Sequence, residues 1–149
     1  AMSTPLAEHW QSAYAKPDDA LSWTRAHLDT SLALLRAHGF APGLRVVDIG
    51  AGRSSLVDDL LDAGLSRITL VDLSQAALDA VRERLGARAA SVRFLAGDLR
   101  TLPLPAAGFD RWHDRAVAHF LTTPEDEAAY GTQVRHAVAP GGIVVIGGF

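Results

Sequence analysis

The chain is built around residues 46–55, which read Val46-Val47-Asp48-Ile49-Gly50-Ala51-Gly52-Arg53-Ser54-Ser55. The valines and the isoleucine are β-branched, as is typical of a short strand buried on both faces of a sheet. The two glycines predict a tight turn, because glycine adopts positive φ and leaves room for a ligand beside the backbone. The two serines can cap a following helix. Such a turn directs free N–H groups at a ligand above the strand, and a nucleotide-like ligand is the first hypothesis.

Two departures from the dinucleotide-binding fingerprint narrow this hypothesis. That fingerprint requires a third glycine where this chain has Ser55. The fingerprint also does not include a carboxylate two residues before its first glycine, where this chain has Asp48. The charge of Asp48 would repel a pyrophosphate and attract an ammonium or sulfonium group. The pattern D-x-G-x-G after a strand resembles motif I of the class I S-adenosylmethionine (SAM) methyltransferases. This resemblance implies a SAM site that includes Asp48, Gly50, Ala51 and Gly52.

Length and composition limit the classes of protein to consider. A chain of 149 residues predicts a single domain, residues 1–149, in which residues 1–22 form a polar N-terminal arm. The net charge of −3 gives no electrostatic reason to expect nucleic acid or an anionic membrane as partner. No apolar run has the length of a membrane span, and no signal peptide is recognisable. The absence of cysteine excludes thiolate chemistry and favours a cytoplasmic location, and His9, His27 and His38 have no metal-ligand spacing.

Aromatic residues gather near the beginning of the chain. The spacing of apolar residues predicts a helix from Ser22 to His38. Tyr14 and Trp23 allow two interpretations: they pack this region onto the sheet, or one of them covers a bound sulfonium, since an aromatic face attracts a cation.

A second buried strand is predicted at residues 68–71 and ends at Asp72, 22 residues after Gly50. A carboxylate at this place can accept hydrogen bonds from ribose hydroxyls, with Leu73 beside it. The alternative is a helix cap or a surface charge. Ser74 is expected to cap the next helix.

The third predicted strand, residues 92–96, leads to Gly97, Asp98 and Leu99. Asp98 could accept a hydrogen bond from the adenine amino group, while the N–H of Leu99 meets a ring nitrogen. The alternative is a turn-forming aspartate next to a glycine.

The fourth predicted strand, residues 109–114, is polar at four of its six positions, whereas a central strand is usually aliphatic. One interpretation is a buried His113, with Asp114 capping a helix at residues 116–121. In the other, both residues face the methyl group and its acceptor as catalytic groups, and Asp114 touches the amino group of the methionine portion. Thr123 is expected to cap the next helix, and the acidic residues 125–127 are interpreted as a helix start and not as a site.

A fifth strand is predicted at residues 143–146, after a turn at residues 140–142. Strands that alternate with helices predict an α/β Rossmann-like three-layer sandwich with parallel strand order 3-2-1-4-5. Residues 112–117 are similar to a bacterial methyltransferase subgroup with the motif W-H-D-R-A, and loosely to the D-K-G stretch of some protein-lysine methyltransferases.

The family's sheet usually continues with two antiparallel strands, and this chain ends before them. The sheet is therefore expected to be truncated after strand five. Its aliphatic edge carries no charge or proline between residues 143 and 149, so a homodimer through this edge is predicted. The alternative is that the natural protein has residues beyond Phe149 that cover the edge.

Together these features predict a SAM-dependent methyltransferase with a small-molecule or protein acceptor. A SAM-binding module without turnover is the alternative from another class. A nicotinamide-dependent dehydrogenase is disfavoured by Ser55 and Asp48.

Overall fold

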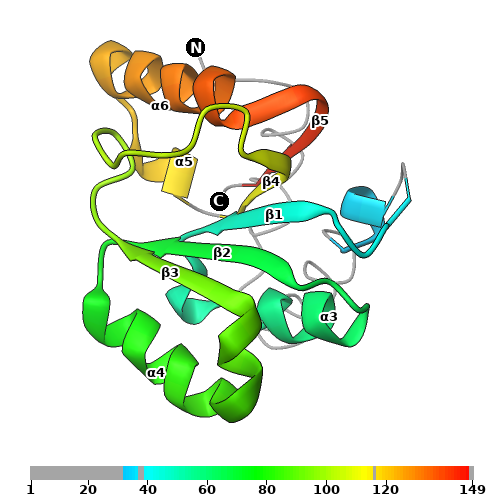
Figure 1. The fold of residues 1–149 in the computed structure, drawn as a ribbon. Coiled ribbons are helices and arrows are strands. Elements are labelled where there is room, and N and C mark those ends of the chain that lie inside the picture. Colours follow the sequence, from blue (N-terminus) through cyan, green and yellow to red (C-terminus); the bar gives the residue numbers. More distant parts are fainter. Residues whose placement is uncertain (1–31, 37–38, 116, 148–149) are drawn as a thin grey trace, which may run out of the picture.

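The computed structural model describes residues 32–36, 39–115 and 117–147, shown in colour in Figure 1. Its centre is one five-stranded parallel sheet in the order β3-β2-β1-β4-β5. The predicted strand order and Rossmann-like architecture are confirmed. The strands are β1 (Arg45–Ile49), β2 (Arg67–Asp72), β3 (Val92–Ala96), β4 (Phe109–Asp114) and β5 (Val138–Ile146).

Helices pack on both faces of the sheet. They are the 3-10 helices η2 (Ala51–Arg53) and η3 (Gly86–Ser91) and the α-helices α3 (Leu56–Asp62), α4 (Gln75–Leu85), α5 (Val117–Phe120) and α6 (Pro124–Ala137). In Figure 1, α3 and α4 lie at the bottom beside β1, β2 and β3, and α6 lies at the top near β4 and β5. Residues 32–36 are helical, as predicted, while the rest of the predicted first helix and the arm at residues 1–22 lie outside the described residues.

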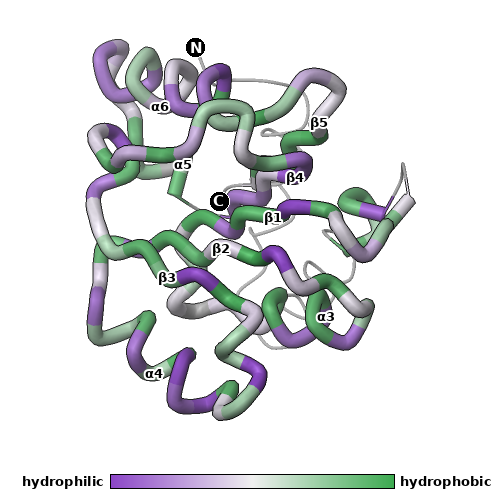
Figure 2. The backbone as a smooth tube through the Cα atoms, in the orientation of Figure 1, coloured by the Kyte–Doolittle hydropathy of each residue, from purple (hydrophilic) through white to green (hydrophobic). Residues whose placement is uncertain are grey.

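Alternation along the central strands creates two hydrophobic cores. Successive side chains of a strand point to opposite faces, so neighbouring residues of β1 separate. Val46 packs in one core with apolar residues of α3 and α4, whereas Val47 packs in the other with Trp112 of β4 and Tyr130 of α6. Figure 2 shows the resulting concentration of hydrophobic residues along β1 and β2.

Capping residues fix where the helices begin. The Ser74 hydroxyl accepts a hydrogen bond from the Ala77 N–H at 3.0 Å, and the Thr123 hydroxyl accepts one from the Asp126 N–H at 3.1 Å. Both predicted caps are confirmed. At α3 the N-cap residue is Ser55, whose side chain makes no capping hydrogen bond, and the hydroxyl of the preceding Ser54 accepts from the Leu56 N–H at 3.1 Å instead.

The fifth strand differs from the prediction. It begins at Val138, and the predicted turn at residues 140–142 lies within it as an irregularity. Val138 pairs with Phe109, but the next pair is Ile143 with Arg111, so extra residues bulge out of β5. The early start comes from the pairing of Val138 with Phe109, and Pro140 is compatible with it because proline biases the residue before it, Ala139, towards extended backbone. The helix predicted at residues 116–121 is also shorter, since α5 spans Val117–Phe120.

Within the described ranges, β5 pairs with β4 alone, so its outer side is a sheet edge. No helix in that part of the chain combines the length and apolar character needed to span a bilayer.

Candidate cofactor site

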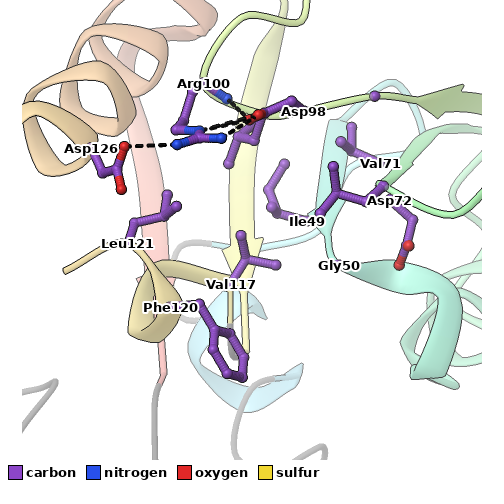
Figure 3. Close-up of a pocket in the computed structure, with 13 residues that line it drawn as sticks. Ile49, Gly50, Val71, Asp72, Asp98, Arg100, Val117, Phe120, Leu121 and Asp126 are labelled. Atoms are coloured by element: carbon purple, nitrogen blue, oxygen red, sulfur yellow. Dashed lines mark hydrogen bonds and ion pairs between the residues drawn. The ribbon is translucent and has the colours of Figure 1, made fainter. Parts of the chain in front are cut away.

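A cavity of about 280 Å³ opens where β1, β2 and β3 end (Figure 3). Ligands of open α/β sheets bind beyond the carboxyl ends of the strands, so this is the expected place for a cofactor. The described lining residues come from these strand ends, the segment after β3, α5 and α6: Ile49, Gly50, Val71, Asp72, Leu73, Gly97, Asp98, Leu99, Arg100, Val117, Phe120, Leu121 and Asp126.

The glycine turn at the end of β1 depends on both of its glycines. Gly50 has φ of 74°, in the left-handed region that glycine favours, and its N–H donates to the Val71 carbonyl at 2.7 Å. A Cβ at Gly52 would lie 2.6 Å from the Ala77 Cβ and 2.9 Å from Asp72 Oδ2. Any residue other than glycine at position 52 would therefore clash with Asp72 of β2 and Ala77 of α4.

Asp72 connects the end of β2 to this turn. Its Oδ2 accepts a hydrogen bond from the Gly52 N–H at 2.9 Å, and its Oδ1 accepts one from the Ser74 N–H at 2.8 Å. Each carboxylate oxygen has a second acceptor position, so Asp72 keeps capacity for the hydroxyls of a ligand.

An ion-pair cluster lies across the cavity from Asp72. The Arg100 guanidinium donates to Asp98 Oδ2 at 2.6 Å and to Asp126 Oδ1 at 2.9 Å, as Figure 3 shows. The Arg100 N–H also donates to Asp98 Oδ1 at 2.9 Å, which is the turn geometry of the alternative interpretation of Asp98. Hydrogen bonds from Arg100 lower the pKa of the Asp98 carboxyl to about 2, so Asp98 is ionised at neutral pH.

Arg100 and Asp126 are cavity residues that the sequence analysis missed. The interpretation of residues 125–127 as a helix start is right for the backbone, but Asp126 also lines the cavity. The described lining includes three carboxylates and one guanidinium. This charge balance favours a cationic ligand over an anionic one.

A buried pair joins the two central strands. Asp48 and His113 are register partners on β1 and β4, and Asp48 Oδ1 lies 2.8 Å from His113 Nδ1. Because a carboxylate only accepts hydrogen bonds, Nδ1 carries the proton and donates it. Among the described residues, neither His113 Nε2 nor Asp48 Oδ2 has a hydrogen-bond partner, although both atoms are buried.

Asp114 is the centre of a second buried network. Its carboxylate accepts hydrogen bonds from the Val117 N–H at 2.7 Å, the Ala118 N–H at 2.9 Å and the Tyr130 hydroxyl at 2.7 Å. Tyr130 in turn accepts from Trp112 Nε1 at 3.0 Å. Burial raises the pKa of Asp114 to about 6, and the hydrogen bond from Tyr130 opposes this rise. These contacts agree with the interpretation of Asp114 as the cap of the helix after β4, and not with a carboxylate that faces the acceptor.

The structure thus brings five of the predicted cofactor residues together in one cavity: Gly50, Asp72, Leu73, Asp98 and Leu99. The other predicted cofactor residues that it describes, Asp48, Ala51, Gly52 and Asp114, are not part of the described lining, and neither is His113, which was predicted as a catalytic residue. Tyr14 and Trp23 lie outside the described residues. No group of three or more potential metal ligands is present in the described ranges.

Comparisons with known proteins agree with this geometry. The eEF1A lysine and N-terminal methyltransferase of Mus musculus is 27% identical over 143 residues, which are 95% of this chain and 20% of that protein. An S-adenosylmethionine-dependent methyltransferase from Mesorhizobium loti has 27% identity and a TM-score of 0.64, covering 84% of this chain and 52% of that one.

A third similar protein is the 1,6-didemethyltoxoflavin-N1-methyltransferase of Burkholderia thailandensis, whose structure contains 1,6-didemethyltoxoflavin and S-adenosylhomocysteine. It has 25% identity and a TM-score of 0.64, covering 97% of this chain and 64% of that one. The chain thus spans about a fifth of the mouse protein and between half and two thirds of the two solved structures. The model of the methyltransferase domain family matches residues 46–142. Since this match covers more than half of the chain and includes the glycine turn and at least part of each of the five strands, the chain belongs to the methyltransferase domain family.

Proposed function

We propose that the protein is a SAM-dependent methyltransferase. The observation that carries this proposal is the cavity at the carboxyl ends of β1, β2 and β3, with Gly50 and Asp72 at its wall. SAM would supply an electrophilic methyl group on a sulfonium. The transfer needs donor and acceptor to be held in line, which a fixed binding site provides.

The residues present fit SAM. Asp72 has free acceptor positions for ribose hydroxyls, and Asp98 and Leu99, which line the same cavity, are the residues that we assign to the adenine. The excess of carboxylates in the cavity suits the positive sulfonium and ammonium groups of the donor. The glycine turn leaves its backbone open to close approach by the ligand.

His113 is the group that we assign to proton removal from the acceptor. Asp48 holds the imidazole with its proton on Nδ1, so the lone pair of Nε2 is directed away from the pair and is unpartnered in the described part of the chain. A histidine oriented by a carboxylate can act as a general base, and in this role the acceptor would have to reach Nε2, which is buried near the end of β4. Asp114 supports α5 beside it and acts as a positioning residue.

The acceptor proposed is a small molecule or a protein. A screen of both classes with radiolabelled SAM and the purified chain tests the proposal, and labelled product establishes the enzyme. Saturable SAM binding without product from any acceptor would instead favour the SAM-binding module without turnover. Absence of SAM binding would contradict both.

Replacing Asp72 with alanine is expected to weaken SAM binding by about 1–3 kcal/mol, the scale of a charge-assisted hydrogen bond. Calorimetric titration of the folded variant measures the change. Asp79→Ala is the matched control, because Asp79 lies exposed on α4 and bonds only Gln75 in the described structure. Equal affinities in wild type and Asp72→Ala would remove Asp72 from the site.

We also propose that two copies associate through the outer edge of β5. The support is that edge, which carries unpaired backbone groups on an aliphatic strand in the described part of the chain. Light scattering over a tenfold concentration range is expected to show a dimer. Val145 packs in the core with residues of α3 and α4, so a lysine there would disturb the fold and cannot test the contact. A monomer at every concentration contradicts the proposal.

The absence of cysteine supports a cytoplasmic location for the enzyme, and the W-H-D-R-A motif at residues 112–116 supports a place in the bacterial subgroup that carries it.

A further inference from the structure

A second hollow, of about 340 Å³, lies at the opposite end of the strands from the cofactor cavity. It is formed where β1, β2 and β3 begin and where the chain enters β4. The described residues that line it include Arg45, Ser66, Arg67, Thr69, Ser91 and Arg93. It shares no residue with the cofactor cavity.

The charge of this hollow is entirely positive in the part of the lining that the structure describes. Three arginines and no carboxylate line it. Arg45 is compensated from outside the lining, since its Nε and Nη2 donate to Asp110 Oδ2 and Oδ1, each at 3.1 Å. Arg67 and Arg93 are exposed and make no ion pair or side-chain hydrogen bond with any described residue.

Strand register places these arginines on one face of the sheet. Arg45 is the direct partner of Arg67 across β1 and β2, and Arg93 is the direct partner of Thr69 across β2 and β3. Because Arg67 and Thr69 are two residues apart, their side chains share a face, and so all three guanidiniums rise from it. Like charges on neighbouring strands are destabilising unless an opposite charge compensates them. Asp110 compensates Arg45 alone, on a chain whose net charge is −3.

We propose that this hollow binds the phosphate group of a small molecule. Guanidinium groups present a planar fork of donors that matches phosphate oxygens, and two of them here have no other described partner. The hydroxyl groups of Ser66 and Ser91 line the same hollow and can donate to further oxygens. Its volume is at the lower end of the range for small-molecule sites, so it suits a compact phosphorylated molecule. A nucleic acid fits less well, because the chain as a whole is acidic.

Calorimetric titration of the full chain with inorganic pyrophosphate at low ionic strength tests the proposal. Saturable binding is expected for the wild type, and Arg67→Gln and Arg93→Gln are each expected to weaken it at least fivefold. Arg135→Gln is the matched control, because it removes the same charge from an exposed position on α6 and should change the affinity less than twofold. Circular dichroism confirms that each variant is folded.

Two further arms identify the source of the phosphate. Tighter binding of glycerol 3-phosphate than of inorganic phosphate assigns the hollow to an organic phosphate, and equal binding assigns it to the free anion. Equal pyrophosphate affinities in Arg67→Gln and Arg135→Gln would overturn the proposal, because the anion would then be attracted by the positive charges of the whole surface and not by this hollow. Tighter binding of a short oligonucleotide than of pyrophosphate would overturn it as well. Pyrophosphate is expected to leave the SAM affinity unchanged. The phosphate-binding test is therefore independent of the proposed methyl transfer.

Discussion

Replacing His113 with asparagine is expected to slow methyl transfer by about 10²- to 10⁴-fold, the range that a positioned general base contributes. The asparagine amide can take the place of Nδ1 and keep the hydrogen bond to Asp48, which is 2.8 Å in the wild type. No atom then replaces Nε2, so the acceptor loses its base while the buried pair stays hydrogen-bonded. SAM affinity is expected to change less than threefold, because neither residue belongs to the described lining of the cavity.

Single-turnover rates with the acceptor from the radiolabelled-donor screen measure the first effect, and calorimetry measures the second. Asp48→Asn should also reduce the rate, since an amide no longer fixes the proton on Nδ1. His136→Asn is the control, because His136 is hydrogen-bonded to the Leu104 carbonyl and has no part in the Asp48–His113 pair. A rate for His113→Asn within threefold of wild type would exclude His113 as the base. Unfolding of both His113→Asn and Asp48→Asn would favour the purely structural interpretation of the pair.

Replacing Tyr130 with phenylalanine is expected to lower the free energy of unfolding by about 2–4 kcal/mol. The change removes the acceptor of Trp112 Nε1–H and one donor to the Asp114 carboxylate, all in the protein interior. A buried polar group without a partner keeps the full cost of its lost hydration. Urea unfolding at pH 7 measures the loss. Thr132→Ala removes an exposed hydroxyl from the same helix and should cost less than about 0.5 kcal/mol.

The same network sets a pH dependence. The pKa of Asp114 is raised to about 6 from an ordinary value of 3.8, so the folded state holds the proton more tightly than the unfolded state. Its contribution to stability is therefore full below about pH 4 and is lost as the pH rises through about 6. The Tyr130 hydrogen bond favours the ionised carboxylate, so Tyr130→Phe should destabilise more at pH 7.5 than at pH 4.5. Equal losses at the two pH values would contradict this assignment.

Residue patterns within a few positions of one another were sufficient to predict the sheet and the helix starts. β-branched runs separated by turns predicted five parallel strands in the right order, and Ser74 and Thr123 cap as expected because a cap acts on an N–H three residues away. The glycine turn was also predictable, because it depends on residues that lie next to one another in the sequence. Strand ends fixed by that order placed Asp72 and Asp98 at one cavity.

Contacts between distant residues were decided by the tertiary structure alone. Strand register joins Asp48 to His113 across 65 positions, and the packing of α6 joins Arg100 to Asp126 across 26. The helix start at residues 125–127 could not show that one of its carboxylates also faces a cavity. The early start of β5 depends on its pairing with β4. No local sequence pattern predicts the bulge in this strand. The physical reason is that propensities and caps act within a turn of backbone, whereas burial, ion pairing and pKa depend on which strands become neighbours.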